Sequence, residues 1–67
     1  MQVKINNKSY SINSNQSIVE SLTELGLFSE TGIAIAVNQK VISKDVWKET
    51  LIKNGDEILV IKATQGG

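Results

Sequence analysis

Hydrophobic and polar residues alternate over two short stretches at the start of the chain, residues 1–5 and 9–13. A period of two residues is typical of a β-strand that is buried on one face. Asn6-Asn7 lies between the two stretches, and asparagine tolerates the positive φ angles that a tight hairpin turn requires. The first 13 residues are therefore predicted to form a β-hairpin.

A helical period follows the hairpin. Ser17 and Glu20 have the S-x-x-E spacing of a capping box, in which each side chain accepts a hydrogen bond from the other residue's backbone N–H. Gly26 suits the left-handed conformation that commonly follows the last helical residue. One helix is therefore predicted over residues 18–26. Its apolar face consists of Ile18, Val19, Leu22 and Leu25.

The second half of the chain indicates three more strands separated by polar turns. They are residues 33–37, which are apolar without alternation as in a central strand, then 40–43 and 58–61. Residues 45–48 form either one helical turn or an irregular loop. The order strand, strand, helix, strand, strand, strand predicts an α+β domain, with four or five strands in one mixed sheet and one main helix across one face.

One helix covers one face of this sheet, yet the last strand is apolar on both faces. Either Ile58 and Val60 or Leu59 and Ile61 must therefore face away from the helix. Lys62 shares the parity of Ile58 and Val60, which weakly favours these two as the outward pair.

Two interpretations of this surplus of apolar residues stay open. In the first, Trp47 and the segment 43–50 fold over the outward side chains. In the second, strand 58–61 is a docking patch for a partner protein beside the C-terminus.

Composition removes several classes of function. The 67 residues include no Cys and no His, which excludes disulfides, thiolate nucleophiles, imidazole bases and nearly all transition-metal sites. Seven lysines balance seven acidic residues without a basic block, so the chain lacks the charge pattern of a nucleic-acid-binding protein. The longest apolar run, residues 33–37, is too short to span a bilayer, and the N-terminus reads as a strand and not as a signal peptide. We expect a cytoplasmic protein with no membrane contact.

No catalytic constellation is present. Ser and Thr nucleophiles would need a base, and the chain offers no imidazole. Four carboxylates lie in polar, turn-like segments and are interpreted as solvated charges. They are Asp45, Glu49, Asp56 and Glu57. We therefore expect neither a bound metal nor a bound cofactor.

The C-terminal carboxylate of Gly67 is the one reactive group that remains. It follows a slim tail, residues 63–67, which we separate from a domain formed by residues 1–62. About one chain in 200 would end in Gly-Gly by chance, so these two residues alone are a weak signal. The alternative to a functional tail is a frayed terminus. A functional tail of this kind threads a narrow slot and presents its carboxylate to another enzyme for activation.

Five segments together resemble the sulfur carrier of thiamine biosynthesis, the ThiS family. They are Gly32–Asn38, Lys44–Trp47, Leu51, Gly55-Asp56 and the terminal Ala63-Thr64-Gln65-Gly66-Gly67. Each segment alone has little specificity, but their order and spacing in so short a chain make the resemblance strong. It runs from the first hairpin to the last residue.

The resemblance implies a ubiquitin-like β-grasp fold, in which the first and last strands are central and parallel. It also implies a carrier that partner enzymes act on, and not an enzyme. A ubiquitin-activating-like adenylyltransferase uses ATP to adenylate the carboxylate of Gly67. A persulfide sulfur donor then replaces AMP and leaves a thiocarboxylate, from which thiazole synthase takes sulfur for the thiazole ring. Gly66 gives access, and Ala63, Thr64 and Gln65 form the flexible lead.

Two departures from the family pattern are visible: Lys44 stands where Arg is usual, and Gln39 stands where Gly is frequent. The small subunit of molybdopterin synthase is a similar carrier, but it usually has a proline pair before its tail. This chain has no proline and keeps Trp47, which favours the thiamine carrier. A ubiquitin-like protein modifier and a passive interaction module stay open as alternatives.

Overall fold

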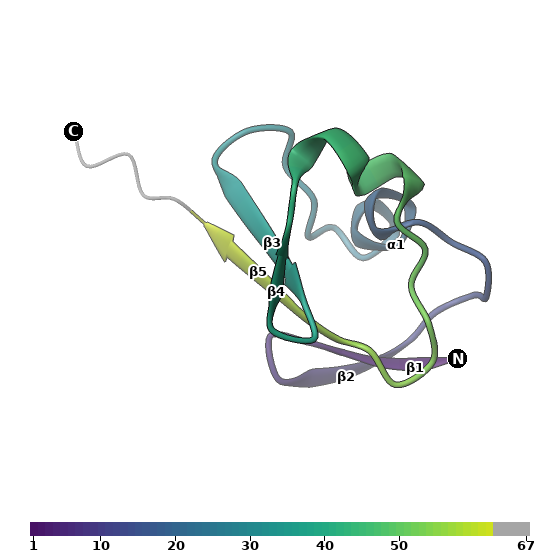
Figure 1. Ribbon diagram of the computed structural model, residues 1–67. Coiled ribbons are helices and arrows are strands. Elements are labelled where there is room, and N and C mark those ends of the chain that lie inside the picture. Colours follow the sequence, from purple (N-terminus) through teal and green to yellow (C-terminus); the bar gives the residue numbers. More distant parts are fainter. Residues whose placement is uncertain (63–67) are drawn as a thin grey trace.

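The computed structural model describes residues 1–62, so the predicted tail, residues 63–67, lies outside the described residues. Five strands form one mixed sheet in the order β2-β1-β5-β3-β4. Helix α1 and the 3-10 helix η1 pack on one face of this sheet (Figure 1). The predicted α+β architecture with one main helix is confirmed. The elements are β1 Gln2–Ile5, β2 Lys8–Ser11, α1 Ile18–Glu24, β3 Ile33–Val37, β4 Lys40–Ile42, η1 Lys44–Glu49 and β5 Glu57–Lys62.

Strands β1 and β5 lie next to each other at the centre of the sheet and run parallel, as the β-grasp prediction required. Their pairing is short, from Lys4 opposite Glu57 to Ile5 opposite Ile58. On its other side β5 pairs antiparallel with β3 over five positions, as far as Ile33 opposite Lys62. The last strand is therefore held mainly by β3.

Both hairpin turns use the left-handed backbone region. Asn6 and Asn7 have φ angles of 52° and 68°, which confirms the predicted β1–β2 turn. The β3–β4 turn repeats this conformation, with φ of 51° at Asn38 and 73° at Gln39. A turn with two positive φ angles matches the right-handed twist of the strands that it joins. Glutamine is an unfavourable residue there, which gives a physical reason for the glycine expected at position 39.

Helix α1 has the predicted N-terminal capping box. The Glu20 amide donates to Ser17 Oγ at 3.1 Å, and the Ser17 amide donates to Glu20 Oε1 at 2.9 Å. The helix ends at Glu24, two residues before the predicted end. Gly26, with φ of 74°, reverses the chain, and the Leu27 amide donates to the carbonyl of Leu22 at 2.8 Å. This hydrogen bond satisfies a carbonyl that the helix end would otherwise leave unpaired.

The core lies between the sheet and the two helices. Trp47 is buried there, and its Nε1 donates to the carbonyl of Ile42 at 2.8 Å. The ring of Phe28 packs edge-on against Trp47, with centroids 6.1 Å apart. The segment left open as a helical turn or a loop is the 3-10 helix η1, which contacts α1. The buried cluster consists of Val3, Ile5, Ile12, Ile18, Leu22, Ile35, Trp47, Ile52 and Ile58.

Polar contacts between two turns fix the start of β5. Asn38 Nδ2 donates to Asp56 Oδ1 at 3.0 Å, and the Glu57 amide donates to Asn38 Oδ1 at 3.0 Å. The Lys53 amide donates to the other Asp56 oxygen at 2.8 Å. Asp56 is only 9% exposed, so the interpretation of this carboxylate as a solvated charge is wrong. The Asp56 side chain accepts one hydrogen bond from its own turn and one from the β3–β4 turn, so it lies between the two turns and is screened from water.

We predict that Gln39→Gly stabilises the protein by about 0.5–1 kcal/mol, because glycine adopts a φ of 73° without the steric cost that glutamine bears. Urea denaturation of both proteins measures the difference. Lys40→Gly is the matched control, since the next residue is in β4 and glycine should weaken a strand. A Gln39→Gly variant less stable than the original would contradict the account of this turn.

We also predict that Asp56→Ala lowers the free energy of unfolding by about 1–2 kcal/mol, because it removes a buried carboxylate that accepts hydrogen bonds from the Asn38 side chain and the Lys53 amide. Glu49→Ala removes an exposed carboxylate and should change stability by less than about 0.5 kcal/mol. Equal effects of the two substitutions in urea denaturation would show that the Asp56 contacts do not stabilise the fold.

Candidate functional site

The predicted sulfur-carrying residue, Gly67, and its lead, Ala63, Thr64, Gln65 and Gly66, lie outside the described residues. Their roles therefore stay predictions. The structure does describe the strand from which the tail leaves. Strand β5 runs away from the β1–β2 hairpin and continues beyond the end of β1 (Figure 1). The site is consequently built here from β5 and its neighbours.

The two faces of β5 differ sharply in exposure. Ile58 is 3% exposed and belongs to the core, and Val60 is partly buried against it. Leu59 and Ile61 are 47% and 49% exposed on the opposite face. The expectation that Ile58 and Val60 face outward is therefore wrong. Lys62 lies on the same face of β5 as Ile58 and Val60. It is nevertheless exposed, because it is the last residue of the strand and its charged side chain reaches water there.

The outward side chains of β5 adjoin small residues of β3. Ala36 lies opposite Leu59, and Ala34 lies opposite Ile61. Across β3, Ala36 also lies opposite Val41 of β4, which is 76% exposed. Residues directly opposite in neighbouring strands share a face of the sheet. These five residues form what we call the outer patch: a row of two alanines flanked by larger apolar side chains.

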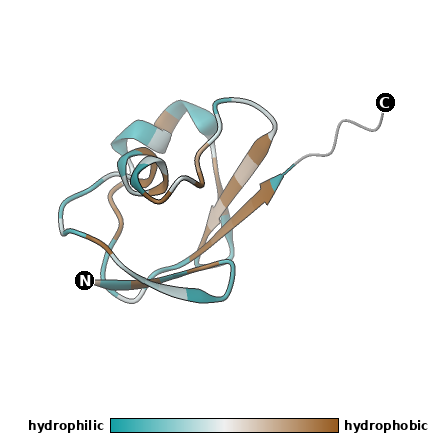
Figure 2. Cartoon of the chain, turned by 180° about the vertical axis from the view of Figure 1, so that it is seen from behind, coloured by the Kyte–Doolittle hydropathy of each residue, from teal (hydrophilic) through white to brown (hydrophobic). Residues whose placement is uncertain are grey.

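Figure 2 shows hydrophobic residues along most of β5, up to its hydrophilic last residue, with the hydrophobic start of β3 beside it. The interpretation that Trp47 and segment 43–50 cover this face is wrong. Trp47 packs in the core, and η1 contacts α1 on the opposite side of the sheet. Of the four residues predicted for docking, Leu59 and Ile61 thus lie on the outer face, whereas Ile58 and Val60 do not.

Sequence reasoning missed Val41 as part of this surface. Its strand was predicted, but which residue of β3 it opposes depends on the register of the β3–β4 hairpin. A two-residue turn at Asn38-Gln39 fixes that register, and this turn was visible in the sequence. Combining the turn with the alternation of β4 could have placed Val41 beside Ala36.

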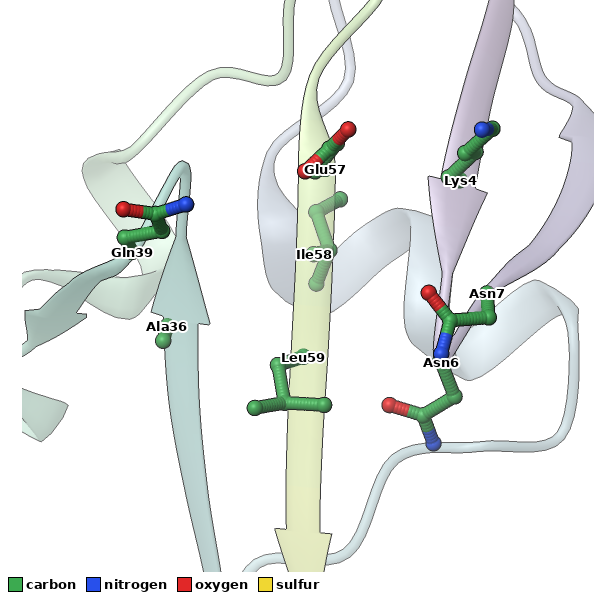
Figure 3. A pocket seen from close by; sticks show the side chains of 8 residues that line it. All are labelled: Lys4, Asn6, Asn7, Ala36, Gln39, Glu57, Ile58 and Leu59. Carbon is green, nitrogen blue, oxygen red and sulfur yellow. The ribbon is translucent and has the colours of Figure 1, made fainter.

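A shallow cavity of about 280 Å³ adjoins the outer patch near the two hairpin turns. Figure 3 shows Leu59 and Ala36 at one end of it and the charged side chains of Lys4 and Glu57 at the other. The remaining side chains are those of Asn6, Asn7, Gln39 and Ile58. The surface beside β5 therefore changes from apolar to polar over a short distance, which suits contact with another protein.

The described residues offer little other chemistry. Residues 1–62 contain no group of three acidic side chains placed to hold a metal ion. In this part of the chain, helices are too short and too polar to cross a membrane. The carboxylates of Asp45, Glu49 and Glu57 are exposed, as expected from the sequence.

Comparison with known proteins gives concordant results. The chain is 28% identical to the sulfur carrier protein ThiS of Escherichia coli K12, and the match covers all of both chains. A crystal structure of the thiamine biosynthesis protein ThiS from Geobacter metallireducens superimposes with a TM-score of 0.83, at 20% identity and full coverage of both chains. A solution structure of a thiamine biosynthesis protein from that organism gives 0.74 at 20% identity, covering this whole chain and 88% of the other.

The two structural matches confirm the ubiquitin-like β-grasp fold. The model of the ThiS family matches residues 3–67, which is nearly the whole chain and includes the tail. The resemblance seen in the sequence is confirmed, and the chain belongs to the ThiS family.

Proposed function

We propose that this protein carries sulfur in thiamine biosynthesis, as a thiocarboxylate on its C-terminal residue, Gly67. The family match through residue 67 is the observation that carries the proposal, because it aligns the diglycine end with the family pattern. The full-length similarity to a protein named as a sulfur carrier supports it.

The chemistry requires activation by a partner, because a carboxylate is a poor electrophile. The Gly67 carboxylate attacks the α-phosphorus of ATP, which releases pyrophosphate and forms an acyl adenylate. A persulfide sulfur then attacks the acyl carbon and expels AMP. A thiol cleaves the sulfur–sulfur bond of the resulting acyl disulfide, which leaves the thiocarboxylate. Thiazole synthase is the proposed acceptor of that sulfur.

The chain acts in this scheme as a substrate of its partners. Its sequence has no His or Cys to serve as base or nucleophile. What it contributes is a slim end and a body that can be recognised. Two glycines allow close approach of the backbone to the walls of a narrow slot.

We assign partner recognition to the outer patch. Leu59 and Ile61 are about half exposed there, immediately before the tail. Residues 63–67, which follow Lys62 and end in the terminal carboxylate, reach at most about 18 Å when extended. An enzyme that holds this carboxylate must therefore contact the end of β5 or surfaces close to it. Exposed apolar residues in that position favour docking.

Intact-mass analysis tests the carrier chemistry. Incubation with the adenylating enzyme, ATP and a persulfide donor should raise the mass of the chain by the difference between sulfur and oxygen. Deletion of Gly67 should abolish this change and leave the urea denaturation curve unaltered, because the buried core lies within residues 1–62.

Three other outcomes count against the proposal. A deletion variant that still gains sulfur would show that Gly67 is not the site. A product joined to a target lysine, without the thiocarboxylate, would indicate a protein modifier. An unchanged mass with a competent enzyme would leave a passive binding module.

We further predict that Leu59→Asp raises the KM of the adenylating enzyme for the carrier at least about tenfold, because it puts a charge into an apolar contact. Leu51→Asp is the matched control, since Leu51 is also a largely exposed leucine but lies outside the five strands of the sheet. Urea denaturation checks that both variants fold. Equal KM values for the two variants would remove the outer patch from partner recognition.

A further inference from the structure

Strand β5 has a neighbour along only part of one of its edges. On the β3 side, pairing continues to Lys62. On the β1 side, it ends at Ile5 opposite Ile58. Among residues 1–62, no strand lies beside the segment Leu59–Lys62 on that side. Figure 3 shows the arrow of β1 ending near Asn6 while β5 continues past it.

Asn6 determines where the pairing stops. Its φ of 52° turns the chain away from β5 after its own amide has donated to the carbonyl of Ile58 at 2.9 Å. Its side-chain Oδ1 then accepts from the amide of Val60 at 2.8 Å. The side chain thus takes the place that the backbone carbonyl of a continuing strand would occupy.

Beyond the Val60 N–H, every second residue of β5 directs its backbone groups to the open side. Amide and carbonyl directions alternate along a strand, and those of Ile58 and Val60 point toward β1. Those of Glu57 point to the β3 side, where its carbonyl accepts from the Asn38 amide at 2.8 Å. By this alternation, the carbonyl of Val60 and the N–H of Lys62 are directed toward the edge that β1 has left. Unpaired groups of this kind form a template for an added strand.

We propose that an extended segment of the enzyme that adenylates Gly67 adds to this edge of β5, donating to the Val60 carbonyl and accepting from the Lys62 amide. The inference rests on the proposed function. It names the contact that would align the Gly67 carboxylate with the active site of the enzyme. A strand paired here fixes the direction in which residues 63–67 leave the domain. Correct orientation of a reacting group is a large part of catalytic rate enhancement.

The chemistry of the edge describes the segment that fits it. Side chains of an added strand alternate between the two faces. Those on the outer face lie next to Leu59 and Ile61, so apolar residues suit them. Those on the other face lie near the ammonium group of Lys62, so an acidic residue suits them.

A second copy of this chain fits the edge less well than an enzyme segment does. Antiparallel pairing of two copies about Lys62 would bring like charges together across the new pair, which is unfavourable. Lysine on a strand edge is also a common protection against edge-to-edge association. An enzyme segment, by contrast, lies beside both the outer patch and the tail that the enzyme must hold.

A chain of 67 residues can be assembled by chemical synthesis, which allows single backbone atoms to be changed. N-methylation of Lys62 removes the proposed donor and should raise the KM for adenylation about tenfold, the effect of losing one hydrogen bond. A Lys62 ester analogue, which lacks the N–H but adds no methyl group, should raise KM in the same direction. Lys62 N–H exchange should slow when the enzyme binds.

N-methylation of Ser9 is the matched control. Ser9 of β2 lies opposite Lys4 of β1, and the Lys4 amide points away from β2, toward the Asp56 carbonyl. Opposite residues of an antiparallel pair direct their backbone groups either both toward each other or both away. The Ser9 N–H therefore points away from β1, at the outer edge of the sheet. This control should keep the KM of the unmodified carrier. Urea denaturation of all the synthetic proteins checks that each one folds.

The possible outcomes separate this inference from the proposed function. If both Lys62 analogues load sulfur with the KM of the Ser9 control, the edge contact is wrong and the carrier function stands. If the unmodified chain fails to load sulfur, the proposed function fails and the inference fails with it. If sedimentation shows a dimer that N-methylation of Lys62 abolishes, the edge belongs to a second copy and the inference is overturned.

Discussion

A five-stranded sheet with both helices on one face cannot bury the apolar residues of both faces. The core on the helix side takes Ile58 and part of Val60. Leu59 and Ile61, which alternate with them, are left half exposed. Because the side chains of a strand alternate strictly, this outcome follows once Ile58 enters the core. The outer patch is thus a direct consequence of the fold, and it lies in the strand that leads to the tail.

Two asparagines hold the last strand from opposite sides. Asn38 accepts from the Glu57 amide where β5 begins, and Asn6 accepts from the Val60 amide where β1 ends. Each is the first residue of a hairpin turn with a positive φ. Glycine could adopt the same backbone conformation, but it has no side-chain oxygen to accept these hydrogen bonds. The same residue type thus serves the turn and the adjoining strand, which couples the two hairpins to β5.

Elements defined by neighbours in the sequence were predictable. The capping box, the glycine after the helix and the Asn6-Asn7 turn each depend on residues a few positions apart. The helix was predicted two residues too long, because Leu25 has the apolar spacing of the helix but serves as its C-cap. The interpretation of Asp56 failed for another reason. Its partner Asn38 comes from a turn 18 residues away, and no local pattern reveals that contact.

The sequence by itself determined the strand and helix segments, the lack of an imidazole or thiol catalyst, and the family pattern that ends in Gly66-Gly67. Those properties depend on local spacing and composition. Only the tertiary structure decided which face of β5 is buried, that Ala36 lies opposite Leu59, and that β1 leaves an open edge beside Val60 and Lys62. Each of these depends on strand register and on the position of the helices, because packing between distant segments, and not the alternation of one strand, sets what a side chain or backbone group faces.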